Sequence, residues 1–312
     1  MNPQGRPTRP QGEAGEVESA GFAEPLIFEQ GQDGRCGVDL PAAPTCEQRL
    51  GDLRRVGKIG LPGLSEPQVV RHYTRLSQSN FSIDGQFYPL GSCTMKHNPR
   101  LNEKLARLPG LADLHPLQHL STVQGALELI DQLALWLKTL TGMPAVALSQ
   151  AAGAQGEFCG MATIKAALAA RGETRTKVLA PESAHGTNPA TAAALGFSVE
   201  TLPANAEGRV DLDVFRAKLG PDVAAIMLTN PNTCGLFERD MLAIAEAIHA
   251  AGAYFYCDGA NFNAIVGRVR PADLGIDAMH INLHKTFSTP HGGGGPGSGP
   301  VVLSAELGQF AP

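Results

Sequence analysis

Hydrophobic and polar positions follow a regular pattern from about residue 121 onward. Short apolar runs predict strands, and they cover residues 145–148, 177–180, 197–202, 223–229 and 253–257. Segments with a helical period predict helices, and they cover residues 122–141, 156–171, 212–219 and 239–251. The runs at 223–229 and 253–257 contain no charged residue, which is typical of strands buried on both faces. Strands that alternate with helices predict an α/β fold with a mainly parallel sheet and right-handed crossovers.

The helix expected at 122–141 carries a stripe of apolar residues on one face. The stripe consists of Leu127, Ile130, Leu133, Leu137 and Leu140. Gly142 follows directly, as is common where a helix ends.

The N-terminal part of the chain has a different character. Residues 1–20 are rich in Pro, Gly, Gln and Glu, which predicts a disordered tail. Residues 21–120 are expected to form an extension of helices and irregular segments. One helix is indicated over 65–76, with Ser65 as its N-cap and a proline in its first turn. The remaining residues, 121–312, are expected to form one large α/β domain.

Composition narrows the class of protein. Of the 312 residues 43% are hydrophobic, and the net charge is −5 without a block of lysine or arginine. Nucleic acid and anionic membrane surfaces are therefore poor partners. No run approaches the roughly 18 apolar residues of a membrane span, and the N-terminus lacks an apolar signal sequence. Six cysteines without CxxC spacing indicate neither zinc nor a disulfide framework. A reducing cytoplasmic location is expected.

Several candidate ligand-binding residues directly follow predicted strands, where ligands of parallel sheets bind. Gly153, Ala154 and Gln155 lead from a strand into a helix, a suitable turn for a phosphate. His185 and Thr233 follow two further strands. Purely structural roles for these residues stay open, because glycine-containing turns often bind nothing, and His, Asn and Thr are also ordinary turn residues.

Asp258 and Lys285 are the strongest chemical candidates. Asp258 ends a buried strand, where an unpaired carboxylate is costly, so it needs a partner such as a pyridinium N–H. The alternative is a carboxylate that caps the turn through Gly259. Lys285 lies between an apolar stretch and four consecutive glycines at 292–295. A desolvated lysine has a lowered pKa and can bond the aldehyde of pyridoxal 5'-phosphate (PLP) as a Schiff base. The alternative is a surface lysine beside a flexible loop.

His280 and His284 are four residues apart, as in the zinc-binding pattern HExxH. Residue 281 is isoleucine, so the glutamate of that pattern is missing. We therefore expect no metal site.

Taken together, these motifs resemble the P-protein of the glycine cleavage system, the decarboxylating glycine dehydrogenase. The closest resemblance is to the C-terminal-type subunit, subunit 2, of the two-subunit form. The resemblance extends from about residue 50 to the end and rests on residues 87–96, 153–157, 183–190, 229–233, 258–261 and 282–299. It implies PLP fold type I, a large domain with a sheet of the seven-stranded type followed by a small C-terminal domain. That small domain is expected to be missing here, through truncation or because the chain is a fragment.

The resemblance also implies residue roles. Lys285 would hold the cofactor as a Schiff base, Asp258 would pair with the pyridine nitrogen, and His185 would stack on the ring. Further cofactor contacts would come from Gly153, Ala154, Gln155, Thr233 and His284. Cys93 and its loop would lie near the mouth of the site. The chain departs from the usual pattern at Ala151–Ala152, where Pro-Asn is common, and at His97, where tyrosine is common.

The implied activity is that of glycine dehydrogenase (aminomethyl-transferring). Glycine would be decarboxylated, and its aminomethyl group would pass to the lipoyl disulfide of the H-protein. The expected partners are subunit 1, in a heterotetramer with two copies of each subunit, and the lipoylated H-protein. Two alternatives are carried forward. One is another fold type I enzyme, such as an amino-acid decarboxylase, lyase or aminotransferase. The other is an inactive fragment or scaffold subunit.

Overall fold

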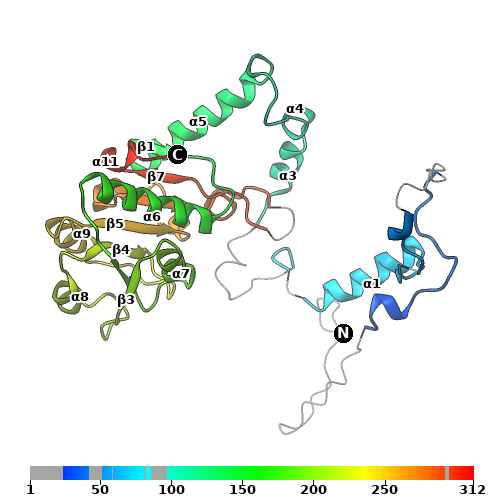
Figure 1. The fold of residues 1–312 in the computed structure, drawn as a ribbon, viewed down its shortest axis with the longest axis horizontal. Helices are drawn as coiled ribbons and strands as arrows, with labels where there is room; N and C mark the ends of the chain where they lie inside the picture. The colour runs from blue at the N-terminus through cyan, green and yellow to red at the C-terminus, as the bar shows by residue number, and fades with distance from the viewer. Residues whose placement is uncertain (1–23, 42–50, 58, 81, 86–96, 292–294) are drawn as a thin grey trace, which may run out of the picture. The chain divides into compact units, whose positions relative to one another are not determined.

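The structure, a computed structural model, describes residues 24–41, 51–57, 59–80, 82–85, 97–291 and 295–312 (Figure 1). The expected tail at 1–20 and the loop of Cys93 lie outside these residues. The chain divides into two compact units, Met1–Tyr88 and Pro89–Pro312. The finer division at residues 20 and 120 stays a prediction.

The first unit contains one long helix. The elements of this unit are the 3-10 helices η1 (Ile27–Glu29) and η2 (Gly51–Leu53) and the helix α1 (Glu66–Gln78). Helix α1 confirms the helix predicted at 65–76. The Ser65 backbone N–H donates to the Gln68 side chain at 2.9 Å, which satisfies one of the donors that precede the helix. Glu24 accepts two hydrogen bonds from Arg75, at 2.6 and 2.7 Å, and so anchors the incoming segment to the helix.

The second unit carries the sheet. Its elements before the sheet are α3 (Arg100–Ala106), α4 (Pro109–Ala112), η3 (Leu120–Thr122) and α5 (Gln124–Thr141). Alternating strands and helices follow, namely β1 (Ala145–Ala147), α6 (Gly153–Ala170), β2 (Lys177–Pro181), α7 (Thr187–Ala194), β3 (Ser198–Leu202), α8 (Leu212–Lys218), β4 (Val223–Thr229), α9 (Met241–Ala250) and β5 (Tyr254–Gly259). The last elements are η4 (Phe262–Ala264), η5 (Pro271–Leu274), β6 (Ala278–Ile281), α10 (Leu283–Thr286), β7 (Val301–Leu303) and α11 (Ala305–Gly308).

The seven strands form one sheet in the order β1-β7-β6-β5-β4-β2-β3. Strands β6, β5, β4, β2 and β3 run parallel, whereas β7 is antiparallel to both β6 and β1. The predicted α/β fold with a mainly parallel sheet is therefore confirmed. Asp258 pairs in register with His280, so the carboxyl ends of the two central strands meet at one place.

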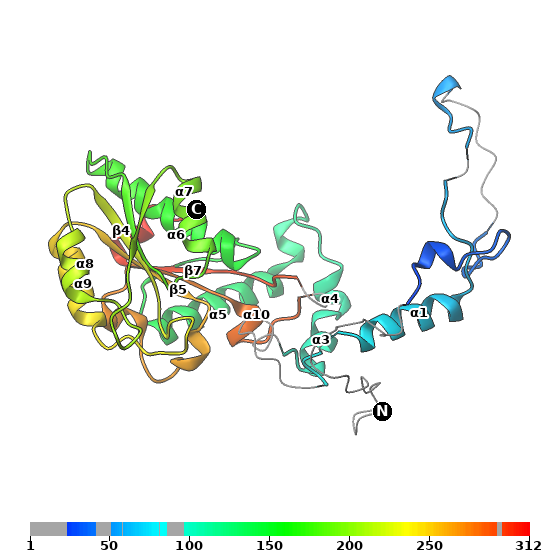
Figure 2. The same cartoon turned by 90° about the horizontal axis from the view of Figure 1, so that it is seen from below.

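Helices cover both faces of the sheet and bury a separate core on each. Figure 2 shows α8 and α9 on one side of the strands and α6 and α7 on the other. Strand β5 serves both cores, because successive side chains of a strand point to opposite faces. Tyr254 and Tyr256 lie in the core with α6, whereas Phe255 and Cys257 lie in the core with α9.

Helix α5 buries only part of its predicted apolar stripe. Leu137 is 1% exposed and Leu133 is partly buried, but Leu127 and Ile130 are 40% and 47% exposed. The helix and its end at Gly142, which has a φ of 72°, are as predicted. Only the C-terminal half of the helix reaches the core that α9 covers. Among the described helices, none is both long and apolar enough to span a membrane.

Candidate active site

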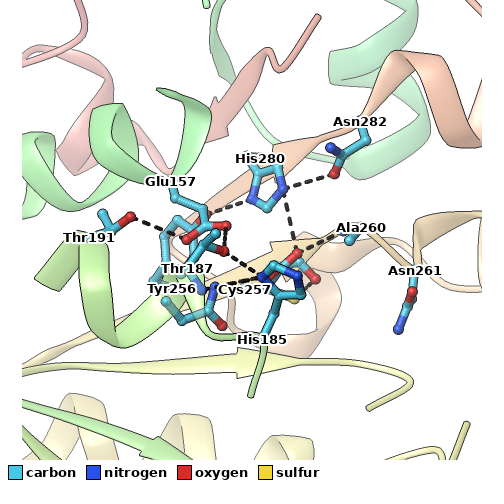
Figure 3. Close-up of polar contacts among 12 residues, drawn as sticks. Glu157, His185, Thr187, Thr191, Tyr256, Cys257, Ala260, Asn261, His280 and Asn282 are labelled. Atoms are coloured by element: carbon cyan, nitrogen blue, oxygen red, sulfur yellow. Dashed lines mark hydrogen bonds and ion pairs between the residues drawn. The ribbon is translucent and has the colours of Figure 1, made fainter. Parts of the chain in front are cut away.

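A cavity of about 280 Å³ opens at the carboxyl ends of β5 and β6. Its lining comes from the start of α6, the segment that leads into α7, the ends of β5 and β6, and α10. Figure 3 shows several of the lining residues, among them His185, Ala260 and His280. Six of the residues that the sequence marks as site candidates line it, namely Gly153, Ala154, His185, Asp258, His284 and Lys285. Residues more than 130 positions apart in the chain thus meet at the sheet edge where ligands of such folds bind.

Gln155 and Thr233 are not among the lining residues. The Gln155 side chain is exposed and accepts a hydrogen bond from the Ala151 backbone N–H at 2.8 Å. The exposed Thr233 hydroxyl donates to the Ser183 carbonyl oxygen. Their contacts to a phosphate and a ring hydroxyl stay predictions.

Asp258 is a buried carboxylate with defined partners. It is 2% exposed and accepts hydrogen bonds from Asn188 Nδ2 at 3.0 Å and from the Ala260 backbone N–H at 2.9 Å. Burial alone would raise the pKa of Asp258, but the electrostatic effect of the neighbouring His280 ring, these two hydrogen bonds and the nearby charge of Lys285 outweigh it and lower the pKa. Asp258 therefore carries a negative charge at neutral pH. It also caps the following turn through the Ala260 N–H, as the alternative interpretation expects, whereas its pairing with a pyridinium N–H stays a prediction.

Behind Asp258 lies a buried chain of polar side chains. The Tyr256 hydroxyl is 2.6 Å from His280 Nδ1, and His280 Nε2 is 2.9 Å from Asn282 Oδ1 and 3.4 Å from Asp258 Oδ1. Asn282 Nδ2 in turn lies 3.4 Å from His284 Nε2. Every one of these side chains is 5% exposed or less.

A second buried carboxylate supports His185. Glu157, on α6, accepts hydrogen bonds from the hydroxyls of Thr187 at 2.6 Å and Thr191 at 3.3 Å. His185 Nδ1 lies 2.8 Å from the Thr187 hydroxyl oxygen. His185 Nδ1 also accepts a hydrogen bond from the Thr187 backbone N–H at 3.3 Å. This chain orients the exposed His185 ring beside the cavity.

The turn into α6 suits an anion. Its first helical residues, Gly153 and Ala154, present backbone N–H groups at the positive end of an 18-residue helix. A side chain at Gly153 would collide with the Asn282 amide, and one at Gly299 would collide with the Ala152 carbonyl. The turn is therefore held directly against the segment that carries Lys285.

The turn after Lys285 is anchored from the start of α3. Asn102 Nδ2 donates to the Ser288 carbonyl oxygen at 2.9 Å, and Asn98 Nδ2 lies 3.3 and 3.2 Å from the carbonyl oxygens of Ser288 and Thr289. Ser288 has a φ of 54°, a left-handed conformation that costs energy for a residue other than glycine. These amides fix the strained turn in place.

Glu157, Asp258 and His280 bring one potential metal-ligating atom each to within 4.8 Å of one another. Each already makes the hydrogen bonds or close polar contacts described above. The expected absence of a metal stays a prediction.

Sequence reasoning assigned no role to Glu157, Thr187, Asn188, Tyr256 or Asn282. A signal for Glu157 existed, since it is the only acidic residue in the helix 153–170. Tyr256 precedes Asp258 by two positions and so shares its face of the strand. The other three lie within quoted motifs, but their partners are distant in sequence.

Comparison with known proteins assigns the fold. Residues 155–294 match the family model Aminotransferase class-V. A crystal structure of glycine decarboxylase (P-protein) of the glycine cleavage system, in inhibitor-bound form, superposes with a TM-score of 0.68 at 26% identity. The match covers 83% of this chain and 57% of that one. The fold and the site define a protein of the PLP-dependent fold type I class.

The sequence relatives of this chain share one description. The chain is 65% identical, over its whole length, to a probable glycine dehydrogenase (decarboxylating) subunit 2 of Caulobacter vibrioides, and it covers 62% of that protein. It is 54% identical to a protein of the same description from Oceanobacillus iheyensis, with 92% of this chain and 61% of the relative covered. Over the 92% or more of this chain that aligns, the match is thus to proteins described as glycine dehydrogenase (decarboxylating) subunit 2. The chain spans about three fifths of the length of these relatives.

Proposed function

We propose that this chain binds PLP and contributes the cofactor site of a glycine-decarboxylating enzyme. The observation that carries the proposal is the buried, negatively charged Asp258 on the same cavity as Lys285. The 65% identity to a probable glycine dehydrogenase (decarboxylating) subunit 2 supports glycine as the substrate. When bound, PLP would supply an electron sink for the negative charge that develops at the α-carbon of the substrate.

The residues around the cavity fit this cofactor. Asp258 is charged and accepts hydrogen bonds, so it can pair with a protonated pyridine nitrogen. The Lys285 amine is the group that would bond the aldehyde carbon. His185, oriented through Thr187, would lie against the ring, and the backbone N–H groups at Gly153 and Ala154 would bind the phosphate.

Three assignments extend this proposal beyond the best-supported contacts. His284 lines the cavity and would contact the cofactor or its lysine. Gln155 and Thr233 would reach the phosphate and the ring hydroxyl only after their side chains turn from their present partners.

The full reaction requires other proteins. The relatives are described as subunit 2, which supports a subunit 1 as partner, in a proposed heterotetramer with two copies of each. The proposed acceptor of the aminomethyl group is the lipoyl disulfide of the H-protein. Within this assembly the present residues would bind the cofactor, hold the ring nitrogen protonated and orient the amino group of glycine.

The test begins with the absorbance spectrum of the purified chain after addition of PLP. Wild type should show the visible band of lysine-bound PLP, and Lys285→Ala should lack it. Lys165→Ala is the matched control, since Lys165 is exposed, donates to the Leu195 carbonyl and does not line the cavity. A band that survives in Lys285→Ala, or no band in wild type, would contradict the proposal.

The substrate is tested after addition of subunit 1 and lipoylated H-protein. Release of CO2 from carboxyl-labelled glycine, dependent on the lipoyl disulfide, is the expected result. Turnover of larger amino acids without that disulfide would instead identify another fold type I enzyme.

A further inference from the structure

The buried contact between Tyr256 and His280 is not explained by packing alone. The two side chains lie on the neighbouring strands β5 and β6, and their rings stack at 6.2 Å with an angle of 17°. The Tyr256 hydroxyl is 2.6 Å from His280 Nδ1, and the two residues are 0% and 1% exposed (Figure 3). At this depth each polar atom needs a partner, so the pair has a defined arrangement of hydrogens.

The direction of this hydrogen bond follows from the surroundings of Tyr256. Burial raises its pKa well above the ordinary value, and the nearby groups of Glu157, Asp258, Cys257 and Cys159 raise it further. The hydroxyl therefore keeps its hydrogen. Among the described residues the only acceptor that it contacts is His280 Nδ1, so the hydrogen is donated there.

The hydrogen of the His280 ring must then be on Nε2. That atom lies 2.9 Å from Asn282 Oδ1 and 3.4 Å from Asp258 Oδ1, and both of these oxygens are acceptors. The Asn282 amide N–H2 faces His284 Nε2, and His284 Nδ1 lies 3.2 Å from the Ser298 carbonyl oxygen. From Tyr256 through His280 to Asn282 the hydrogens thus point in one direction, from β5 toward the segment that carries Lys285.

We infer that Tyr256 and His280 are a positioning pair that holds an N–H toward Asp258 and keeps this carboxylate charged and oriented for the cofactor ring. The inference rests on the proposed function, because the charge of Asp258 matters for the ring nitrogen. Neither residue of the pair touches the reacting atoms of the substrate in this role. They act through Asp258 and, by way of Asn282, on the position of the lysine segment.

The strand itself provides a matched control. Tyr254 lies two residues before Tyr256, packs in the same core and donates its hydroxyl to Glu306 at 2.5 Å. Tyr254→Phe and Tyr256→Phe thus remove the same atom from the same strand, but only the second breaks the contact with His280.

The first measurement uses the full chain without cofactor. Histidine nitrogen NMR, assigned with His280→Gln, should show the His280 ring in the Nε2–H form in wild type and in Tyr254→Phe. Tyr256→Phe should lose this single form. A doubly protonated ring or an Nδ1–H ring in wild type would refute the inferred hydrogen bond from Tyr256 to His280 Nδ1.

The second measurement is the pH midpoint of the visible band after addition of PLP. If Asp258 is a weaker negative partner, the ring nitrogen of the cofactor carries less positive charge. The Lys285 nitrogen that is bonded to the cofactor then keeps its proton to higher pH. Tyr256→Phe should raise the midpoint by about one pH unit, whereas Tyr254→Phe should leave it unchanged. His280→Leu, which has no N–H, should give the same upward shift, and it replaces Tyr256→Phe if that variant does not fold. A downward shift, or a shift no larger than that of Tyr254→Phe, would overturn the inference.

The two measurements separate the inference from the proposed function. No band in wild type would refute the proposed function and the link from the pair to the ring, whereas the pair itself would still be decided by the NMR result. A normal band with unshifted midpoints would refute only the inference.

Discussion

Asn188→Asp is the most incisive test of the charge on Asp258. The Asn188 side chain is fully buried, and its Nδ2 donates to Asp258 Oδ2 at 3.0 Å. Two carboxylates at that separation would repel by about 5–6 kcal/mol at an effective dielectric constant near 20. Taking up a proton at pH 7 by a group with an ordinary pKa near 4 costs about 4 kcal/mol, or about 1.4 kcal/mol per pH unit. Protonation costs less free energy than the repulsion between two charged carboxylates, so the folded variant should bind one extra proton.

This extra proton fixes the sign of the pH dependence. The folded variant binds more protons than its unfolded chain, so its stability relative to wild type falls as pH rises. We expect a loss of about 4 kcal/mol at pH 7 that shrinks by about 1.4 kcal/mol per pH unit toward pH 4. Wild-type Asp258 has the opposite sign, because its lowered pKa contributes stability that is lost only as pH falls through the folded value.

Urea unfolding of the full chain between about pH 5 and 8 measures this difference. Asn188→Ala is the control, because it removes one hydrogen bond to a charged group, worth about 1.5–3 kcal/mol, and adds no ionisable group. Its offset from wild type should therefore be constant over this range. An Asn188→Asp profile parallel to that of wild type would refute the reasoning that Asp258 is a buried anion.

Three further substitutions test other parts of the structure. Ser288→Gly should raise the free energy of unfolding by about 0.5–1 kcal/mol, because it relieves a left-handed residue, and a lower value in urea unfolding would contradict the assigned strain. Gly153→Ala should abolish the visible PLP band while circular dichroism stays unchanged, because the added methyl collides with the Asn282 amide; an unaltered band would show that the turn can yield. The pKa of His249 is raised, chiefly by its hydrogen bond with Asp277. Its contribution to stability is therefore present below the unfolded pKa of about 6.5 and is lost as pH rises through the folded value. His249→Gln should remove this decline from the stability profile.

The sequence predicted the elements whose signal is local. The strands at 223–229 and 253–257 are long apolar runs, and the structure has strands there. Strand β6 was not predicted, because it has only four residues and one of them is histidine. The position of β7 between β1 and β6 depends on pairing between residues more than 150 positions apart, which no local period encodes.

The site divides in the same way. Asp258 and Lys285 could be predicted because a carboxylate at the end of a buried strand and a lysine before a glycine run are unusual for their own segments. Glu157 and Tyr256 could not, because each is defined by a partner on another element, Thr187 for the first and His280 for the second. Long-range hydrogen bonds of this kind are visible only once the strands are placed in order.

The central place of β5 and β6 in the sheet has a consequence for how the cofactor arrives. Each of these strands is hydrogen-bonded on both sides, and each is covered by helices on both faces. Asp258 and His280 should therefore keep their geometry when PLP is absent, and little ordering should be needed when it enters. Association should then depend on passage through the mouth of the cavity, and backbone amides beneath it should exchange with deuterium equally slowly with or without PLP.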